Sequence, residues 1–190
     1  DEEITVPELV KEDTLCPHQD YVYFAFPTKE EQEQLDAFSQ QKNALLQQLT
    51  SDPLFCQHLQ TCQALSGQIS DDELLNEPQY LSATLIFLRS KGIAFPQRFQ
   101  DLLGAKKLPA FTLDWLEILL QGLLFQVPHW YNLPEEYEKQ LLHELKAASL
   151  IDRKQVKLVR NKKQDLLLNQ SLGKLNAVRE IFKAEYQALG

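Results

Sequence analysis

Residues 112–127 read TLDWLEILLQGLLFQV, and this stretch decides the fold that we expect. On a helix, with about 100° between successive residues, Asp114, Glu117 and Gln121 fall on one narrow polar stripe. Apolar side chains cover most of the remaining circumference: Leu113, Trp115, Leu116, Leu119, Leu120, Leu123 and Leu124. A helix that is apolar over so much of its surface is normally buried among other elements. The sequence therefore predicts a buried central helix over about 112–127.

The ends of this helix carry recognisable signals. Thr112 can cap the first turn, and Pro128 stops the helix because proline lacks an N–H group and restricts the residue before it. Gly122, inside the helix, costs about 1 kcal/mol relative to alanine. We therefore expect a neighbouring backbone to approach the helix closely at Gly122.

Capping residues, prolines and glycines divide the rest of the chain into further helices. The segments 28–31 and 70–73 have the form of a capping box, and Asp52-Pro53 places a cap before a proline at the first helical position. Glycines follow three of the apolar periodicities: Gly67, Gly92 and Gly104. We expect helices from Thr28 and from Pro53, a short turn after Ser70, and helices over 78–91, 96–103, 134–148 and from about 171. Short connections between such helices predict a mainly α fold, an orthogonal or antiparallel bundle around the central helix.

Two segments leave a β alternative open. Residues 21–26 (YVYFAF) have strong β character and are followed by Pro27. Residues 152–169 fit a helix, which is the interpretation that we favour, but 156–158 and 166–168 also fit two strands that turn at 161–163. Such a hairpin, within 155–168 and directly after helix 134–148, would resemble the wing of a winged helix.

The composition limits the classes to which this protein can belong. The 190 residues are 44% hydrophobic and 24% charged, as in a globular chain. No apolar run reaches the roughly 18–20 residues of a membrane-spanning helix, and no N-terminal segment is typical of a signal peptide. The three cysteines, an odd number, are typical of free thiols in a reducing compartment. We therefore expect a cytoplasmic protein without an integral membrane segment.

The charge is unevenly distributed along the chain. Residues 1–149 hold 10 basic and 23 acidic residues, whereas residues 150–190 hold 9 basic and 4 acidic residues. We divide the chain into an acidic arm with a short extended segment (1–27), a helical core domain (28–149), and a basic segment with a C-terminal helix that packs on the core or extends from it (150–190). This asymmetry is the main indication of a partner.

No constellation of residues points to catalysis, a cofactor or a metal. Cys16-Pro-His18 and Cys56-Gln-His58 carry metal-ligating residue types, but residues 56 and 58 of a helix point about 200° apart and cannot share one ion. Nucleophile elbows and phosphate-binding glycine loops are also missing from the sequence. We therefore expect a non-enzymatic protein without a cofactor or metal.

Two segments are candidates for binding a partner. Six cations lie within eleven residues without an acid between them: Arg153, Lys154, Lys157, Arg160, Lys162 and Lys163. In the helical interpretation, Arg153, Lys157 and Arg160 share one face. The second candidate is the aromatic loop His129-Trp130-Tyr131, because tryptophan and tyrosine are enriched at interaction hot spots. Simpler roles are a solvated face, or contact with the acidic arm, for the cations, and plugging the end of a bundle for the aromatic residues.

These observations favour a helical protein–protein interaction domain, such as an adaptor, a chaperone or a subunit of a complex. Its acidic body and basic C-terminal segment predict another protein with an acidic surface as the partner. The alternative is a nucleic-acid-binding domain that uses the basic segment at 153–163, and a basic hairpin next to helix 134–148 would favour it.

Overall fold

The computed structural model describes residues 24–159 and 162–188. The chain divides into two compact units. The larger unit holds residues 29–171, so the boundary that we predicted at residue 149 falls inside it. The smaller unit holds the flanking stretches, of which 24–28 and 172–188 are described. The predicted acidic arm (1–20) and residues 21–23 of the predicted β segment lie outside the described residues, and residues 24–28 form no strand.

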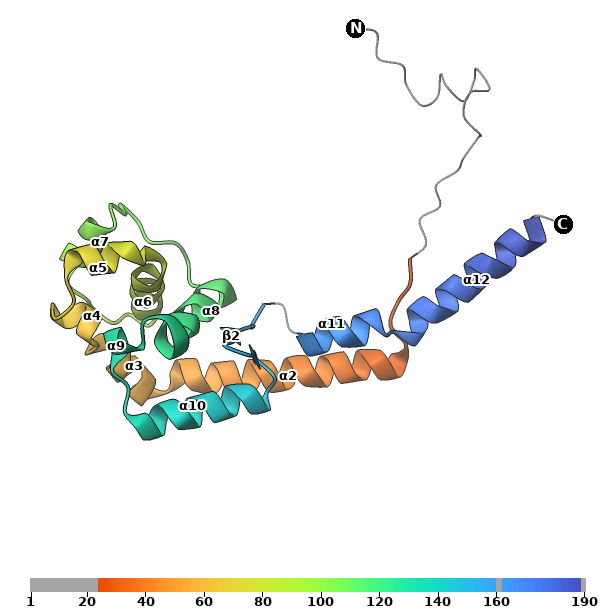
Figure 1. The fold of residues 1–190 in the computed structure, drawn as a ribbon, viewed down its shortest axis with the longest axis horizontal. Coiled ribbons are helices and arrows are strands. Elements are labelled where there is room, and N and C mark those ends of the chain that lie inside the picture. Colours follow the sequence, from red (N-terminus) through yellow and green to blue (C-terminus); the bar gives the residue numbers. More distant parts are fainter. Residues whose placement is uncertain (1–23, 160–161, 189–190) are drawn as a thin grey trace, which may run out of the picture. The chain divides into compact units, whose positions relative to one another are not determined.

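Helices form nearly all of the regular secondary structure, which confirms the predicted mainly α fold (Figure 1). The larger unit contains α2 (Lys29–Ser51), α3 (Pro53–Gln60), α4 (Gln63–Ser66), α5 (Asp71–Asn76), α6 (Pro78–Ser90), α7 (Gln97–Leu102), α8 (Leu113–Gln121), the π-helix η1 (Gly122–Gln126), α9 (Pro128–Tyr131), α10 (Glu135–Ala147) and α11 (Lys162–Asn169). Between α10 and α11, β1 (Ile151–Asp152) and β2 (Gln155–Val156) form an antiparallel hairpin. The smaller unit contains α12 (Leu172–Ala188).

Two of the predicted helix starts are confirmed by side-chain caps, and two of the predicted helix ends are confirmed by glycines. The Asp52 carboxylate accepts a hydrogen bond of 2.9 Å from the backbone N–H of Leu54 at the start of α3. The Ser70 hydroxyl accepts one of 3.3 Å from the N–H of Glu73 at the start of α5. Gly92 and Gly104 follow α6 and α7 with φ of +68° and +62°, a conformation that glycine adopts without strain.

The core forms where α8 packs on α6. Leu116, Leu119, Leu120 and Leu123 are each at most 1% exposed, which confirms the predicted buried face. The prediction was wrong at the start of the helix, because Leu113 is 40% exposed and Trp115 is only half-buried. α6 is buried along most of its length, from Tyr80 to Leu88, so two helices rather than one form the centre of the bundle.

Gly122 is a close-packing position, as predicted, but the neighbour is a side chain rather than a backbone. A Cβ atom added at Gly122 would lie 2.6 Å from Cδ1 of Tyr80 on α6. The helix also changes its winding here, because the N–H of Val127 bonds to the carbonyl of Gly122, five residues earlier. The predicted single helix over 112–127 is therefore α8 followed by one π-helical turn. Thr112 stands at the N-cap position, but its hydroxyl bonds to Asp114 at 3.4 Å instead of capping the backbone.

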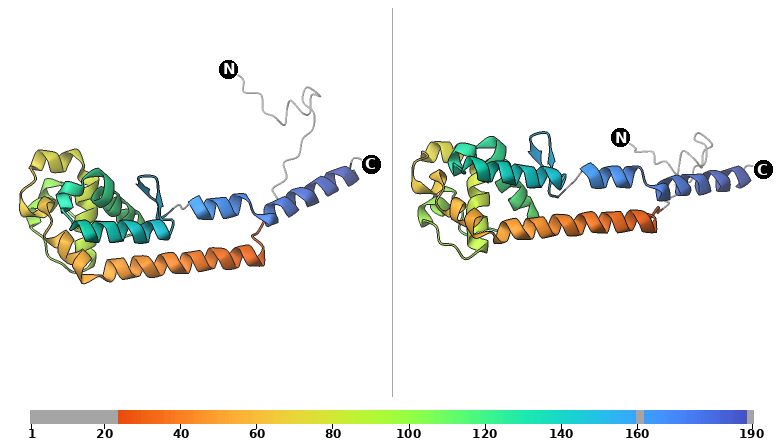
Figure 2. Two further views of the ribbon diagram at one scale, coloured as in Figure 1. Left: turned by 60° about the horizontal axis from the view of Figure 1, so that its bottom comes forward. Right: turned by 90° about the horizontal axis from the view of Figure 1, so that it is seen from below.

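Two later helices of the larger unit, α10 and α11, lie along the long helix α2. α10 lies beside its C-terminal half and α11 beside its N-terminal half (Figures 1 and 2). Lys42 Nζ donates to the carbonyl oxygen of Leu158 at 3.2 Å, and the Ser171 hydroxyl donates to the carboxylate of Glu31 at 3.0 Å. Hydrogen bonds at Leu158 and Ser171 therefore attach the chain that follows α10 to α2.

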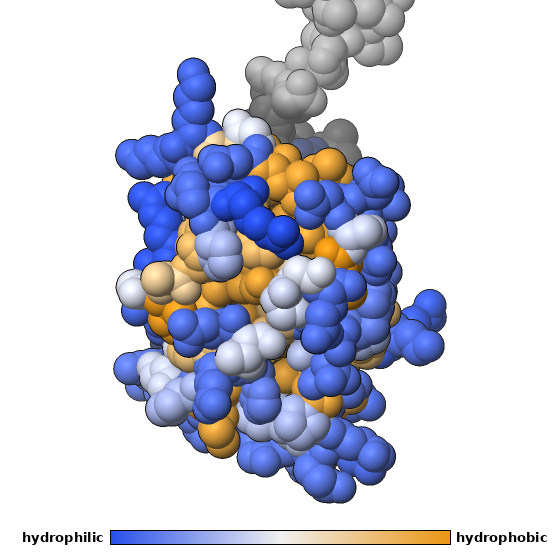
Figure 3. Space-filling model, turned by 90° about the vertical axis from the view of Figure 1, so that its left-hand side faces the viewer, coloured by the Kyte–Doolittle hydropathy of each residue, from blue (hydrophilic) through white to orange (hydrophobic). Residues whose placement is uncertain are grey.

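Polar residues cover most of the face shown in Figure 3, with smaller hydrophobic areas between them. None of the described helices is long and apolar enough to cross a bilayer.

Truncating Leu120 to alanine tests the central position of α8. The Leu120 side chain is fully buried, so we expect Leu120→Ala to lower the free energy of unfolding by about 2–5 kcal/mol in denaturant titrations. Leu113→Ala, at the exposed start of the same helix, is the matched control and should cost less than about 1 kcal/mol. Equal losses in the two variants would contradict the packing described above.

Substituting Gly122 tests its contact with Tyr80. Alanine suits a helix better than glycine, so local propensity alone predicts that Gly122→Ala is stabilising. The 2.6 Å approach predicts the opposite, a loss of about 1–3 kcal/mol through overpacking. A double-mutant cycle with Tyr80→Ala should show that Gly122→Ala costs less, or nothing, once the ring is absent.

Candidate functional site

The basic segment begins as a β-hairpin at the C-terminal end of α10. Ile151 pairs with Val156 and Asp152 pairs with Gln155, so Arg153 and Lys154 form the two-residue turn. Lys157 follows β2, and its N–H donates to the carbonyl of Leu150 at 2.8 Å. The favoured prediction of a helix over 152–169 is therefore wrong for its first half. Only residues 162–169 are helical, as α11.

The hairpin alternative was also placed wrongly. We predicted it within 155–168, with strands at 156–158 and 166–168, but the observed strands are 151–152 and 155–156, and 166–168 belong to α11. The burial pattern explains the difference. Val156 and Leu158 are both buried whereas Lys157 between them is half-exposed, an alternation that an extended chain provides and a helix does not.

The polar stripe of α8 holds this segment in place. Glu117 accepts hydrogen bonds at one carboxylate oxygen from the N–H groups of Leu158 (2.5 Å) and Val159 (3.0 Å). In a continuous helix these N–H groups would bond to carbonyls four residues earlier. A half-buried carboxylate therefore replaces the helical partners, which is the physical reason that the chain is extended here.

Gln121 completes the attachment one turn later on α8. Its amide oxygen accepts from the N–H of Val156 at 2.9 Å, and its amide nitrogen donates to the carbonyl of Lys154 at 3.1 Å. We predicted that this stripe is polar, but not that it binds backbone groups. The sequence did contain an indication of this contact. A buried helix with a glutamate and a glutamine one turn apart needs polar partners for both side chains.

The predicted cations are only partly brought together. Arg153 and Lys154 lie exposed side by side in the hairpin turn, and Lys157 is nearby on the extended segment. The shared helical face predicted for Arg153, Lys157 and Arg160 does not form, because 151–159 is not helical, and Arg160 lies outside the described residues. Lys162 and Lys163 belong to the first turn of α11.

The predicted aromatic loop is a short helix, α9, that fills the interior. The side chains of Trp130 and Tyr131 are 0% and 3% exposed, so in this structure they present little surface to a partner. The Tyr131 hydroxyl lies 2.9 Å from the hydroxyl of Thr84 on α6, and burial raises the pKa of Tyr131. His129 alone of the three is exposed. The two buried residues thus plug the bundle, the simpler role that the sequence allowed.

Glu73 fixes α9 to α5 from the surface. Its carboxylate oxygen lies 2.7 Å from Nε2 of His129 and accepts a 3.2 Å hydrogen bond from the indole N–H of Trp130. These hydrogen bonds, that from His129 above all, lower the pKa of the Glu73 carboxyl. We predicted Glu73 as part of a capping box, whereas its side chain binds His129 and Trp130.

The described thiols lie in the packed part of α3 and the turn after it. Burial raises the pKa of both thiols, that of Cys62 to about 11, so they remain protonated near neutral pH and are poor nucleophiles.

Cys16 and His18, which carry metal-ligating residue types, lie outside the described residues. The described residues contain no group of three or more histidine, cysteine, aspartate or glutamate side chains that could hold a metal ion.

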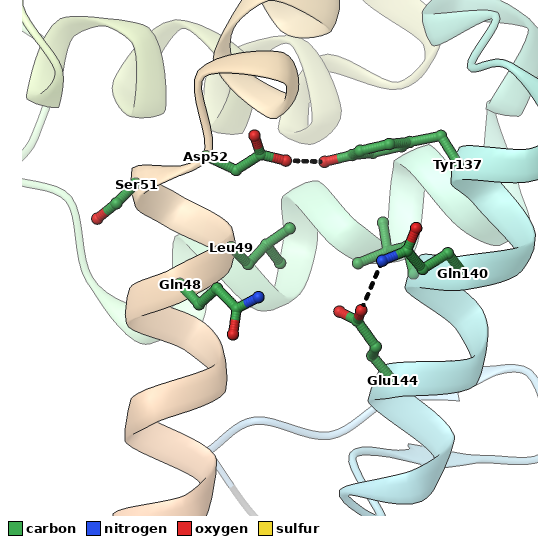
Figure 4. Close-up of a pocket in the computed structure, with 8 residues that line it drawn as sticks. Gln48, Leu49, Ser51, Asp52, Tyr137, Gln140 and Glu144 are labelled. Carbon is green, nitrogen blue, oxygen red and sulfur yellow. Dashed lines mark hydrogen bonds between the residues drawn. The ribbon is translucent and has the colours of Figure 1, made fainter.

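A cleft of about 370 Å³ lies between α2 and α10 (Figure 4). The Tyr137 hydroxyl donates to Asp52 at 2.8 Å, and the Gln140 amide donates to Glu144 at 2.9 Å. Burial, and then the hydrogen bond to Asp52, raise the pKa of Tyr137, so the phenol remains a donor. Asp52 also caps α3, so this arrangement fixes α10 to the α2–α3 corner and offers no activated nucleophile.

Comparisons with known proteins add no relative. The chain matches no protein-family model, no curated protein and no solved structure.

Replacing Glu117 tests the attachment of the hairpin. Glu117→Gln should weaken the acceptor for two backbone N–H groups, because hydrogen bonds to a charged group are worth about 1.5–3 kcal/mol. We expect the amides of Leu158 and Val159 to exchange hydrogen about tenfold faster or more, while α6 amides keep their protection. Asp114→Asn makes the same chemical change on the same stripe, but Asp114 is exposed and should leave the hairpin amides unaffected. Uniformly faster exchange in Glu117→Gln would instead indicate global destabilisation.

Proposed function

We propose that this chain is a non-enzymatic helical interaction domain that presents the turn Arg153-Lys154, together with Lys157, to an acidic surface of another protein. The proposal covers an adaptor, a chaperone or a subunit of a complex. The helical core acts as the scaffold, and the hairpin on α8 acts as the contact element.

The backbone of Arg153 is the observation that carries the proposal. Its φ is +59°, in the left-handed region where a residue with a Cβ costs roughly 1–2 kcal/mol and where hairpin turns normally use glycine or asparagine. An arginine at this position is easier to explain by what its side chain does than by its local conformation. Arg153 and Lys154 also make no ion pair with any residue in the described ranges, so both charges are available to a partner.

The support of the turn strengthens this interpretation. Four hydrogen bonds from Glu117 and Gln121 hold the backbone on both sides of Gln155. A contact element that is already ordered loses less conformational entropy on binding than a flexible loop does. The backbone that carries Arg153 and Lys154 is therefore already ordered before a partner binds.

Nucleic acid is the second candidate partner, because a basic hairpin does follow α10, the arrangement that would favour it. In a nucleic-acid-binding domain of this kind, α10 would be the helix that contacts the nucleic acid beside the hairpin. The charge of α10 argues against this role. The helix carries Glu135, Glu136, Glu138 and Glu144 against Lys139 and Lys146, and so would repel phosphates. An acidic protein surface that contacts the turn alone avoids this repulsion.

We place the interaction in a reducing compartment such as the cytoplasm. Cys56 and Cys62 are free thiols, and Cys62 is buried in the core.

Replacing Arg153 with glycine separates the side chain from the backbone. Glycine relieves the positive φ, so Arg153→Gly should leave the stability unchanged or raise it by up to about 1 kcal/mol. The same variant should weaken binding to the acidic partner, because one charge is removed. Denaturant titration gives the first quantity and calorimetric titration of the captured partner gives the second. A variant that is destabilised and binds as tightly as the parent would contradict the proposal.

A charge-matched pair of variants tests the location of the contact. R153S/K154S and K106S/K107S each remove two positive charges, the first from the hairpin and the second from the exposed loop before α8. Affinity capture from the native source, with and without nuclease, should lose its partner only with the hairpin variant. Loss with both variants would indicate unspecific attraction.

The salt dependence of the affinity distinguishes the two classes of partner. Affinity for duplex nucleic acid would fall with a log–log slope near −0.9 per phosphate contact. For an acidic protein surface, salt should act mainly on the association rate.

A further inference from the structure

A second cleft, of about 530 Å³, lies between the C-terminal end of α6 and the loop that joins α7 to α8 (Figure 1), and the proposed function does not use it. Its volume is within the range of about 300–1,000 Å³ that is typical of ligand pockets. Ile86 of α6 and Leu108 of the loop line it and are almost completely buried. The half-buried ring of Phe111, held with its centroid 5.5 Å from that of Phe87, completes a fixed apolar surface.

Two cations and no acidic residue line the same cleft. Arg89 follows Ile86 by three residues, so it lies on the same face of α6 as the apolar surface. Lys107 is exposed in the loop. Neither cation forms an ion pair with a carboxylate of residues 24–159 or 162–188. The cleft therefore suits a ligand that carries an apolar group and an anionic group close together.

The Arg89 side chain joins the two walls of this cleft. Its Nη1 donates to the carbonyl oxygen of Leu108 at 2.7 Å, which leaves other N–H groups of the guanidinium for a ligand. A chain that lies in the cleft therefore ends at this bridge instead of passing it. The end of a polypeptide carries either an ammonium group or a carboxylate, and two cations select the carboxylate.

We propose that this cleft binds the apolar C-terminal residue of another polypeptide. The carboxylate of that residue pairs with Arg89 and Lys107, and its side chain covers the apolar surface that Ile86, Leu108 and Phe111 form. Positions three apart on a helix have Cβ atoms about 5–6 Å apart, a span that one residue and its own carboxylate cover. The site shares no residue with the hairpin contact, so the two proposals stand independently.

The loop also offers backbone groups to a peptide. The N–H groups of Ala110 and Phe111 take part in no hydrogen bond within the part of the chain that the structure describes, and Ala110 is exposed. The carbonyl groups of an extended peptide end can accept from such donors. A free carboxylic acid has no backbone carbonyl to offer, so these donors favour a polypeptide.

A titration of the full 190-residue chain with acetyl-Gly-Gly-Phe, followed by amide chemical shifts, tests the proposal. We expect saturable shifts at Ala110 and Phe111 with a millimolar or lower Kd. Acetyl-Gly-Gly-Phe amide lacks the carboxylate and acetyl-Gly-Gly-Gly lacks the apolar side chain, so each should bind about tenfold more weakly or worse. The absence of saturable shifts at about 10 mM acetyl-Gly-Gly-Phe, or equal binding of its amide, would overturn the proposal.

Two further probes decide the class of ligand. 3-Phenylpropionate has the same ring and carboxylate but no peptide groups, and acetyl-Glu-Gly-Phe amide carries its carboxylate within the chain rather than at its end. Each should bind at least about fivefold more weakly than acetyl-Gly-Gly-Phe. Equal binding of 3-phenylpropionate would assign the cleft to a free acid. Equal binding of the second peptide would assign it to an internal acidic segment, and either result would contradict a C-terminal ligand.

Neighbouring lysines provide a matched pair of variants. Lys107 lines the cleft, whereas Lys106 is equally exposed and does not. Lys107→Gln should weaken binding of acetyl-Gly-Gly-Phe about threefold or more, and Lys106→Gln should leave it within about twofold of the parent. Equal losses in the two variants would indicate general attraction to the positive charge of the loop and would overturn the proposal.

Ala110→Asp places a like charge beside the bound carboxylate. Ala110 is exposed, so the variant should keep its circular dichroism and its melting temperature while binding acetyl-Gly-Gly-Phe about tenfold more weakly. R153S/K154S should bind the tripeptide as the parent does, which separates this site from the hairpin. A folded Ala110→Asp variant with parental affinity would show that the peptide lies elsewhere.

Discussion

The contact between α8 and α6 is the constraint on which the rest of the larger unit depends. Gly122 allows the ring of Tyr80 to lie directly against the helix backbone, at a distance that no Cβ could occupy. This close approach brings Leu119 and Leu120 fully into the core. The π-helical turn begins at the same glycine, and α9 follows it to insert Trp130 into the interior.

The opposite side of α8 determines where the basic residues lie. Because one side of the helix is used for the core, Glu117 and Gln121 project toward the chain that leaves α10, and they bind its backbone. The hydrogen bonds that would have formed a helix in this segment are replaced. Arg153 and Lys154 consequently stand in a tight turn rather than on a helical face.

Polar residues that begin helices have second roles in the tertiary structure. Asp52 caps α3 and also accepts a hydrogen bond from Tyr137 of α10, and Glu73 in the first turn of α5 binds His129 and Trp130 of α9. Each such residue combines a role at the start of a helix with a contact 56 to 85 residues away in sequence. These hydrogen bonds help to position the short helices, which have only small apolar faces, relative to one another.

The sequence alone determined the features that depend on near neighbours in the chain. Caps at Asp52 and Ser70, glycine terminators after α6 and α7, and the apolar periodicity of the central helix from Leu116 onward each act over a few residues, and these are confirmed. The fold of residues 151–159 and the neighbour of Gly122 were decided only in the tertiary structure. Helical periodicity over 152–169 is a weak local preference, and the carboxylate of Glu117, 41 residues away from Leu158, outweighs it by binding the backbone directly. Local propensity could not reveal this partner, because the partner reaches the segment only when α8 is packed in the core.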